Sequence, residues 1–174
     1  PFFVYLAPNV THLPLKVADH YTKHHLANGM NEKLAVFYGM VDNLDENVGR
    51  LSAFLKQEGL DENTIILFTT DDGTQGAAIS QTEKPWFKGM RGKKGSREEG
   101  GHRVFCFLRW PAGLGSRDNG TIISVLDVYP TLLDLCGFKV PDSVKIEGRS
   151  FKPYLANPLD VEDDDRMVFF YYYN

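Results

Sequence analysis

Cysteine is scarce in this sequence, and long apolar runs are absent from it. The 174 residues include only 2 cysteines, Cys106 and Cys136, so no disulfide framework can form and the redox compartment is left open. No stretch approaches the roughly 18 apolar residues of a membrane-spanning helix. The net charge of -4 means that basic residues do not dominate. The overall charge therefore gives no reason to expect a nucleic-acid partner.

What is present is an ordinary globular composition, with 43% apolar and 24% charged residues. A chain of 174 residues is long enough for one domain with a sizeable core. Its opening segment, Pro1–Ala7, has the pattern of a fully buried strand and lacks the basic residues of a signal peptide. A chain that opens inside a core strand leads us to expect a piece of a longer protein.

Helix and strand patterns alternate along the chain, which predicts an α/β fold with helices on both faces of a sheet. Apolar residues at spacings of three and four predict one core-facing helix between the N-cap Asn31 and Gly59. Ser124 and Gly137 bound a second expected helix over residues 124–135. The apolar stripe of the first helix consists of Leu34, Phe37, Val41, Leu44, Val48, Leu51 and Leu55. Further strands are expected at residues 64–70, 104–110 and 167–173.

Asp71 and Asp72 follow the strand expected at residues 64–70. Ligands of open α/β sheets bind beyond the carboxyl ends of strands, and paired carboxylates suit a hard cation such as Ca²⁺ or Mg²⁺. Two carboxylates do not complete the coordination shell of such a cation, so other ligands must come from elsewhere. The competing interpretation is a turn that Asp71 caps and Asp72 and Gly73 complete.

A glycine- and lysine-rich loop over residues 73–101 follows these carboxylates, and loops of this length are usually functional or disordered. Lys94, beside Gly95, can supply a positive charge to an anion that the backbone lets approach closely. A metal and this lysine would together hold a sulfate or phosphate ester. A mobile basic surface loop is the alternative. A single-strand nucleic-acid groove needs more aromatic residues than Trp86 and Phe87.

His12 lies in the loop after the first expected strand, where a histidine suits proton transfer near neutral pH. His20, His24, His25 and His102 compete for this role, and each of the five can equally be a structural residue. His24 and His25 have no third ligand at metal-binding spacing, so no zinc site is expected there.

Several segments of the chain, taken in order, carry a resemblance to a known family. They are Pro1–Pro8 with His12–Leu15, Met40–Arg50, Ile65–Gly73, Arg91–Arg103 followed by Val104–Pro111, Asp127–Asp134 and Glu147–Phe151. Together they resemble the type I sulfatases, the arylsulfatase-like members of the alkaline-phosphatase superfamily, over nearly the whole chain. Each segment is weak by itself, and their shared order makes the resemblance specific.

The resemblance implies a partial sulfatase-like mixed sheet flanked by helices. Residues 1–150 would be the C-terminal part of a catalytic domain, and residues 151–174 the start of a smaller subdomain. The whole protein would be a sulfuric ester hydrolase of periplasmic, secreted or lysosomal location, acting on a small sulfate ester or a sulfated glycan. An incomplete sheet would leave an apolar edge exposed, through which the chain would dimerise.

The resemblance also implies residue roles. Asp71 and Asp72 would be Ca²⁺ ligands, Lys94 would contact the sulfate, and His12 would contact the ester and help the leaving group depart. Asp72 stands where the family usually has asparagine, and its extra negative charge would raise the demand for cations.

The family nucleophile is missing from these residues. Sulfatases use a formylglycine made in a Cys/Ser-x-Pro/Ala-x-Arg motif, and neither Cys106, Cys136 nor any serine fits it. We expect the nucleophile, further metal-binding aspartates and a second lysine in a segment N-terminal to this one. A phosphoesterase or phosphotransferase of the same superfamily and a non-catalytic pseudo-sulfatase binding module are the alternatives.

The first prediction follows from the missing motif. The untagged chain alone is expected to hydrolyse no aryl sulfate above the level of a His12→Ala control, and to bind Ca²⁺ weakly in calorimetry. Turnover above that control, or submicromolar Ca²⁺ binding, would contradict the prediction.

Overall fold

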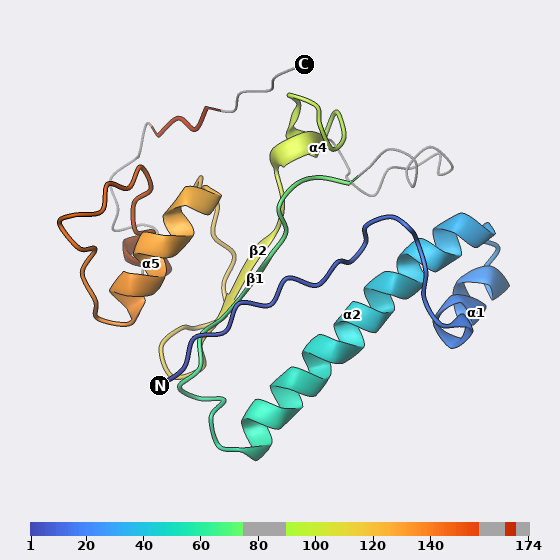
Figure 1. The fold of residues 1–174 in the computed structure, drawn as a ribbon, viewed down its shortest axis with the longest axis horizontal. Helices are drawn as coiled ribbons and strands as arrows, with labels where there is room; N and C mark the ends of the chain where they lie inside the picture. Colours follow the sequence, from blue (N-terminus) through green and yellow to red (C-terminus); the bar gives the residue numbers. More distant parts are fainter. Residues whose placement is uncertain (75–89, 157–165, 170–174) are drawn as a thin grey trace. The chain divides into compact units, whose positions relative to one another are not determined.

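The computed structural model describes residues 1–74, 90–156 and 166–169 of the chain (Figure 1). The chain divides into two compact units. The first unit contains Pro1–Thr64 and Asp72–Arg103, and the second contains Ile65–Asp71 and Val104–Asn174.

Two packed helices dominate the first unit, α1 (Asp19–Ala27) and α2 (Glu32–Gln57). The Asn31 side chain accepts a hydrogen bond from the Leu34 amide at 3.0 Å, which confirms the predicted N-cap of α2. A Cβ at Gly39 would lie 3.1 Å from the carbonyl oxygen of Tyr21, so glycine allows α1 to approach α2 closely. The tyrosine hydroxyl then donates a 2.6 Å hydrogen bond to Glu46 further along α2.

The apolar stripe of α2 is buried at its two ends and more open in its middle. Leu34 and Phe37 are buried near α1, and Leu55 is buried near the other end. Val41 and Leu51 are each 37% exposed, so the prediction of one continuous core-facing stripe is wrong in the middle of the helix. The physical reason is the length of α1, which spans 9 residues against 26 in α2 and cannot cover it all.

The second unit contains a pair of strands, β1 (Ile66–Thr69) and β2 (Cys106–Arg109). They run antiparallel, with Ile66 opposite Arg109 and Thr69 opposite Cys106. These two strands confirm the predictions for residues 64–70 and 104–110, with narrower bounds. Stacked rings add to the pairing, because the Phe105 ring lies 5.2 Å from that of Phe68.

Helical turns follow the strands in the second unit. Ser124 caps a 3-10 turn, η1 (Val125–Asp127), which leads into α5 (Val128–Leu135), as predicted for residues 124–135. The short helix α6 (Lys152–Ala156) packs on α5. The Thr131 hydroxyl joins them, because it accepts a 2.9 Å hydrogen bond from the Phe151 amide.

Asp127 is the buried polar centre of this unit, with 0% exposure. Arg166 holds its carboxylate with two hydrogen bonds of 2.6 and 2.7 Å, and the amides of Ser124 and Arg149 donate two more at 2.7 and 2.9 Å. Burial alone would raise the pKa of Asp127, but the hydrogen bonds from Arg166 and from the two amides outweigh it and lower the pKa.

The segment Pro1–Ala7 differs from its prediction. It is not a strand of the described sheet, and its side chains are exposed, with Phe3 at 78% and Tyr5 at 82%. An apolar run becomes a strand only where a neighbouring strand supplies hydrogen-bond partners, and in the described part of the chain β1 pairs with β2 alone. The prediction of a fully buried strand is therefore wrong.

The predicted last strand differs as well. Met167–Phe169 has no strand geometry, and the rest of the range 167–173 lies outside the described residues. Among the described residues, no helix has the length and hydropathy needed to cross a membrane.

The second prediction concerns the carboxylate of Asp127. Asp127→Ala should lower the free energy of unfolding by about 3–5 kcal/mol, because it leaves the Arg166 charge without its partner. Chemical denaturation measures this loss, and Asp118→Ala at an exposed position is the matched control.

The same substitution should change the response to acid. The pKa of Asp127 is lower in the folded than in the unfolded chain, so its contribution is present above the unfolded value of about 3.9 and is lost as the pH falls through the folded value. The stability gap between wild type and variant should therefore shrink below about pH 4. A gap that does not change with pH would contradict this assignment.

Candidate functional site

The loop from Arg91 to Arg103 is folded on itself rather than open. Gly92 and Gly95 have positive φ angles of 91° and 78°, which glycine adopts without strain. The Ser96 hydroxyl accepts a 3.0 Å hydrogen bond from the amide of Lys93. The last part of the loop forms the short helix α4 (Glu99–His102), so the prediction of an irregular loop over residues 73–101 is wrong there. Residues 75–89 of that range lie outside the described part.

The segment that follows β1 is joined to this loop through the backbone. The amide of Gly73 donates to the carbonyl of Gly101 at 3.0 Å, and the amide of Lys94 donates to the carbonyl of Thr74 at 3.0 Å. A Cβ at Gly73 would clash with the Gly100 carbonyl oxygen, so the two backbones meet where only glycine fits. The contact places the loop lysines beside the residues that follow the strand.

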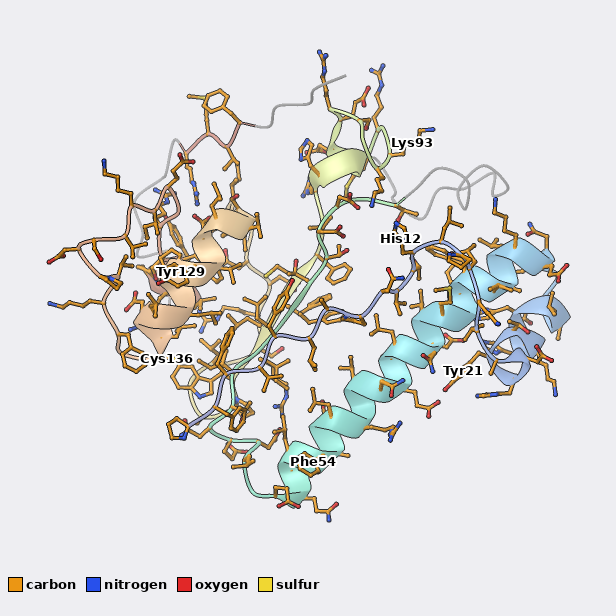
Figure 2. All side chains as sticks on the ribbon, in the orientation of Figure 1. His12, Tyr21, Phe54, Lys93, Tyr129 and Cys136 are labelled. Atoms are coloured by element: carbon orange, nitrogen blue, oxygen red, sulfur yellow. The ribbon has the colours of Figure 1, made fainter. Side chains whose placement is uncertain are left out.

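Lys94 and Asp72 form an ion pair in this contact. Lys94 Nζ lies 3.1 Å from Asp72 Oδ2, and both side chains are about one-third exposed, at 35% and 34%. Lys93, the neighbouring candidate, is exposed (Figure 2). Two of the four predicted site residues are thus in direct contact.

The other two predicted residues have local partners. Asp71 is exposed and accepts a 3.2 Å hydrogen bond from the Thr70 hydroxyl through its Oδ1. His12 is exposed in the loop ahead of α1 (Figure 2), and its Nδ1 lies 2.8 Å from the carbonyl oxygen of Leu13. The convergence of His12 and Asp71 with the Lys94–Asp72 pair stays a prediction.

Charged neighbours of Lys94 are themselves paired. Glu99 binds Arg103 at 3.1 Å, and Glu98 lies 4.0 Å from Arg91. A hydrogen bond from the Ser96 side chain lowers the pKa of Glu98. These acidic groups are engaged with arginines, while the ammonium group of Lys94 is directed to Asp72.

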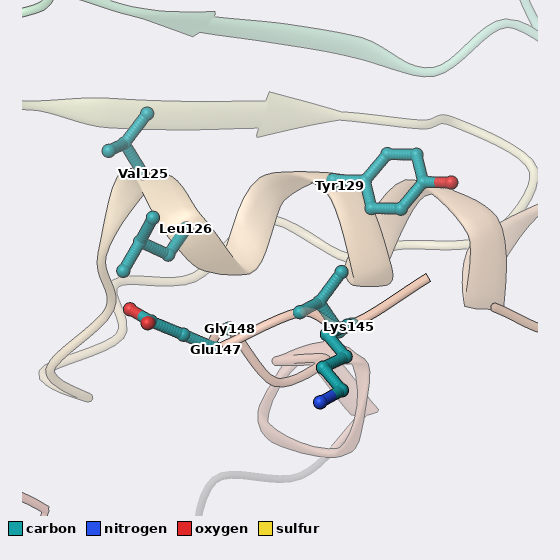
Figure 3. A pocket seen from close by; sticks show the side chains of 7 residues that line it. Val125, Leu126, Tyr129, Lys145, Glu147 and Gly148 are labelled. Atoms are coloured by element: carbon teal, nitrogen blue, oxygen red, sulfur yellow. The ribbon is translucent and has the colours of Figure 1, made fainter. Parts of the chain in front are cut away.

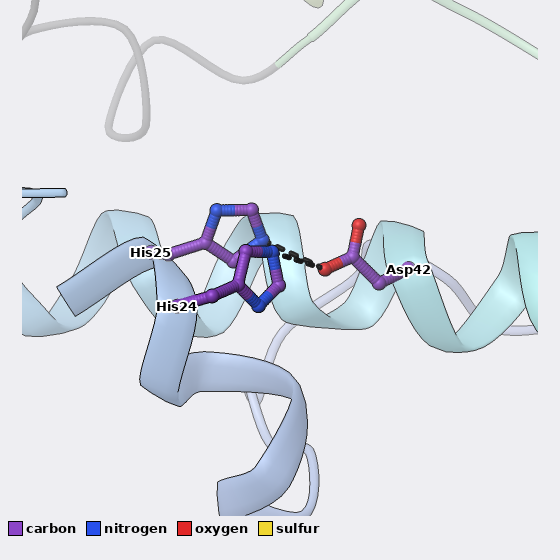
Figure 4. A group of neighbouring side chains, drawn as sticks. All are labelled: His24, His25 and Asp42. Carbon is purple, nitrogen blue, oxygen red and sulfur yellow. Dashed lines mark hydrogen bonds and ion pairs between the residues drawn. The ribbon is translucent and has the colours of Figure 1, made fainter. Parts of the chain in front are cut away.

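Two further features were not expected from the sequence. His24 and His25 on α1 meet Asp42 on α2 (Figure 4), so the argument that they lack a third ligand is wrong. The sequence carries no local signal for this contact, because Asp42 lies on α2 and the two histidines lie on α1. A pocket in the second unit is lined by Val125, Leu126, Tyr129, Lys145, Ile146, Glu147 and Gly148 (Figure 3).

Ligands of open α/β sheets bind beyond the carboxyl ends of strands, and the Lys94–Asp72 pair lies in the segment that follows β1. The Sulfatase family model matches residues 1–138, and the chain belongs to this family. The resemblance stated from the sequence is thereby confirmed.

Individual relatives agree with this family. The chain is 32% identical over 170 residues to the uncharacterized sulfatase YdeN of Escherichia coli, covering 97% of this chain and 29% of that protein. It is 32% identical over 178 residues to N-acetylgalactosamine-6-sulfatase of Rattus norvegicus, covering 98% of this chain and 31% of that protein. The chain thus spans about a third of the length of these relatives.

Solved structures show the same fold. The crystal structure of Ps i-CgsB in complex with k-i-k-neocarrahexaose has a TM-score of 0.77 at 33% identity, over 90% of this chain and 34% of that one. A Bacteroides thetaiotaomicron protein of glycosaminoglycan metabolism has a TM-score of 0.73 at 23% identity, over 89% of this chain and 32% of that one. The predicted α/β, sulfatase-like fold class is therefore confirmed.

The third prediction tests the glycine contact. A Cβ at Gly73 would clash with the Gly100 carbonyl oxygen, so Gly73→Ala should lower the free energy of unfolding of this contact by about 1–3 kcal/mol. Hydrogen exchange at the amides of Lys94 and of position 73 should accelerate. Gly115→Ala, where a Cβ would meet open space, is the matched control. Equal exchange in both variants would contradict the role of the contact.

Proposed function

We propose that this chain contributes part of the active site of a sulfuric ester hydrolase, in which Lys94 and His12 act on the sulfate ester. The observation that carries the proposal is the position of Lys94, whose ammonium group is held 3.1 Å from Asp72 in the segment that follows β1. Membership of the sulfatase family supports the reaction class.

Lys94 provides the positive charge for the sulfate. Its amide is anchored to Thr74 at 3.0 Å, so the backbone that carries the side chain is held in place before substrate binds. A positioned cation stabilises the charge that develops on a transferring group more effectively than a mobile one. The greater exposure of Lys93 supports the choice of Lys94 over its neighbour.

His12 provides the proton for the leaving group. Its Nδ1 lies 2.8 Å from the Leu13 carbonyl oxygen, which accepts a hydrogen bond when Nδ1 carries a proton. In the imidazolium form, the second ring nitrogen can then donate its proton to the alcohol oxygen as the sulfur–oxygen bond breaks. The contact with Leu13 would orient the ring for this step.

The carboxylates of Asp71 and Asp72 fit a hard divalent cation, because both offer oxygen ligands. We propose Ca²⁺ in the whole protein, where the bound ion would polarise a sulfate oxygen as a Lewis acid. Lys94 contacts Oδ2 of Asp72, so Oδ1 is left as the oxygen that would bind the metal ion. The positive charge of Lys94 also offsets the extra negative charge of this aspartate.

Sulfated glycans are the substrate class that we propose. One relative is named N-acetylgalactosamine-6-sulfatase, and the structure with a TM-score of 0.77 is of a complex with k-i-k-neocarrahexaose. Both names describe sugar substrates or ligands of similar proteins. The exposed position of His12 is compatible with a leaving group as large as a sugar.

The fourth prediction separates the two lysines in the full-length protein. Lys94→Ala should lower kcat/KM for a sulfated sugar by about 10²–10³-fold, because the sulfate loses a positioned cation. Lys93→Ala is the matched control and should stay near wild type. Equal losses in both variants would contradict the assignment.

A sulfate and a phosphate monoester of the same alcohol should be compared in the same experiment. Preference for the sulfate ester supports the proposed function, whereas preference for the phosphate ester supports the phosphoesterase alternative.

A further inference from the structure

Three metal-binding side chains meet where α1 packs on α2 (Figure 4). The Nε2 atoms of His24 and His25 lie 3.2 and 2.8 Å from the same carboxylate oxygen, Oδ2 of Asp42. These three ligand atoms all lie within 4.8 Å of one another. Among the described residues, His24, His25 and Asp42 are the one group of histidine, cysteine or acidic side chains placed closely enough to hold a metal ion.

The convergence of two consecutive histidines is unusual for a helix. Side chains at positions i and i+1 point in different directions around a helix and do not normally face each other. Here the rings of His24 and His25 lie 3.8 Å apart, in the last turn of α1, and both nitrogens are directed to one oxygen. The arrangement therefore concentrates three donors in one small volume.

Two imidazole nitrogens and one carboxylate oxygen form a donor set that suits Zn²⁺. Zinc–nitrogen and zinc–oxygen bonds of about 2.0–2.1 Å place neighbouring ligands of a tetrahedral ion roughly 3.3–3.4 Å apart. The observed nitrogen–oxygen separations of 2.8 and 3.2 Å are close to this spacing. Small side-chain rotations would admit the ion, with a fourth position left for water.

The packing around the cluster holds its ligands in place. His25 is only 9% exposed, and its ring lies 5.5 Å from that of Tyr38. Gly39 allows α1 to approach α2 at this level, since a Cβ there would lie 3.1 Å from the Tyr21 carbonyl oxygen. Ligands carried by two packed helices are better positioned than ligands on loops. His24 has a more exposed side chain, at 58%, which gives an ion access from solvent.

We propose that His24, His25 and Asp42 form a binding site for a divalent transition metal of the zinc type, which joins α1 to α2. This site is independent of the proposed function, because its nitrogen donors differ from the all-oxygen ligands that Ca²⁺ takes. Its role is structural, since the bound ion links two helices that otherwise meet through side-chain packing.

The experiment is a titration of the metal-free chain with Zn²⁺ by calorimetry, and with Co²⁺ by its visible absorption. The chain carries Cys106→Ser and Cys136→Ser, because both cysteines are exposed thiols that would bind zinc themselves. An excess of Ca²⁺ is present to occupy oxygen sites. We expect one bound metal per chain and a higher midpoint of thermal unfolding with Zn²⁺ than without it.

His24→Ala and Asp42→Asn are the test variants, since neither removes a fully buried side chain. Each should weaken Zn²⁺ binding by about 100-fold or more. Removing a residue that only hydrogen-bonds to a metal ligand already costs about 10–100-fold in metal affinity, and these variants remove a ligand itself. His20→Ala, an exposed histidine on the same helix, is the matched control and should bind as wild type does.

Circular dichroism of the metal-free variants verifies that they fold. Zinc binding by folded His24→Ala or Asp42→Asn that equals that of the control would overturn the proposal. Absence of stoichiometric binding to wild type would also overturn it, and would mean that the three residues form only a histidine–carboxylate hydrogen-bond cluster. Neither result would affect the assignments of Lys94 and His12, which activity measurements test separately.

Discussion

The backbone contact between Gly73 and Gly101 is the constraint on which the candidate site depends. Their 3.0 Å hydrogen bond brings the loop to the segment that follows β1, and the clash that a Cβ at Gly73 would make leaves no room for another residue. Because the backbones meet here, the Lys94 amide reaches the Thr74 carbonyl and its side chain reaches Asp72. The position of the Lys94 ammonium group thus depends on glycines at positions 73 and 101, which let the two backbones meet.

The ion pair itself contributes little to stability. Lys94 and Asp72 are each about one-third exposed, at 35% and 34%, and pairs near the surface contribute about 0–1 kcal/mol. Its importance is positional, because it holds the ammonium group of Lys94 beside Asp72. The buried pair of Asp127 and Arg166 in the second unit differs, since its carboxylate is fully enclosed and holds four hydrogen bonds.

Elements with strong local signals could be predicted from the sequence. Helix α2 has an Asn31 cap and regular apolar spacing, and both act within a few residues of one another. The helix α1 has no comparable signal, because its residues, DHYTKHHLA, carry little apolar periodicity. It is held by its packing on α2 at Gly39, which lies 12 residues beyond the end of α1 at Ala27. Pro1–Ala7 shows the converse, since its apolar residues suggest a buried strand but nothing local provides a partner.

The sequence by itself determined the family, the order of its segments, the helix caps and the residue types available for chemistry. Only the tertiary structure decided which of these residues meet: Lys94 with Asp72, and His24 and His25 with Asp42. Caps and periodicity depend on neighbours a few positions away, and they can be read along the chain. Contacts between distant residues depend on how packed elements bring their side chains together, and sequence spacing alone does not contain that information.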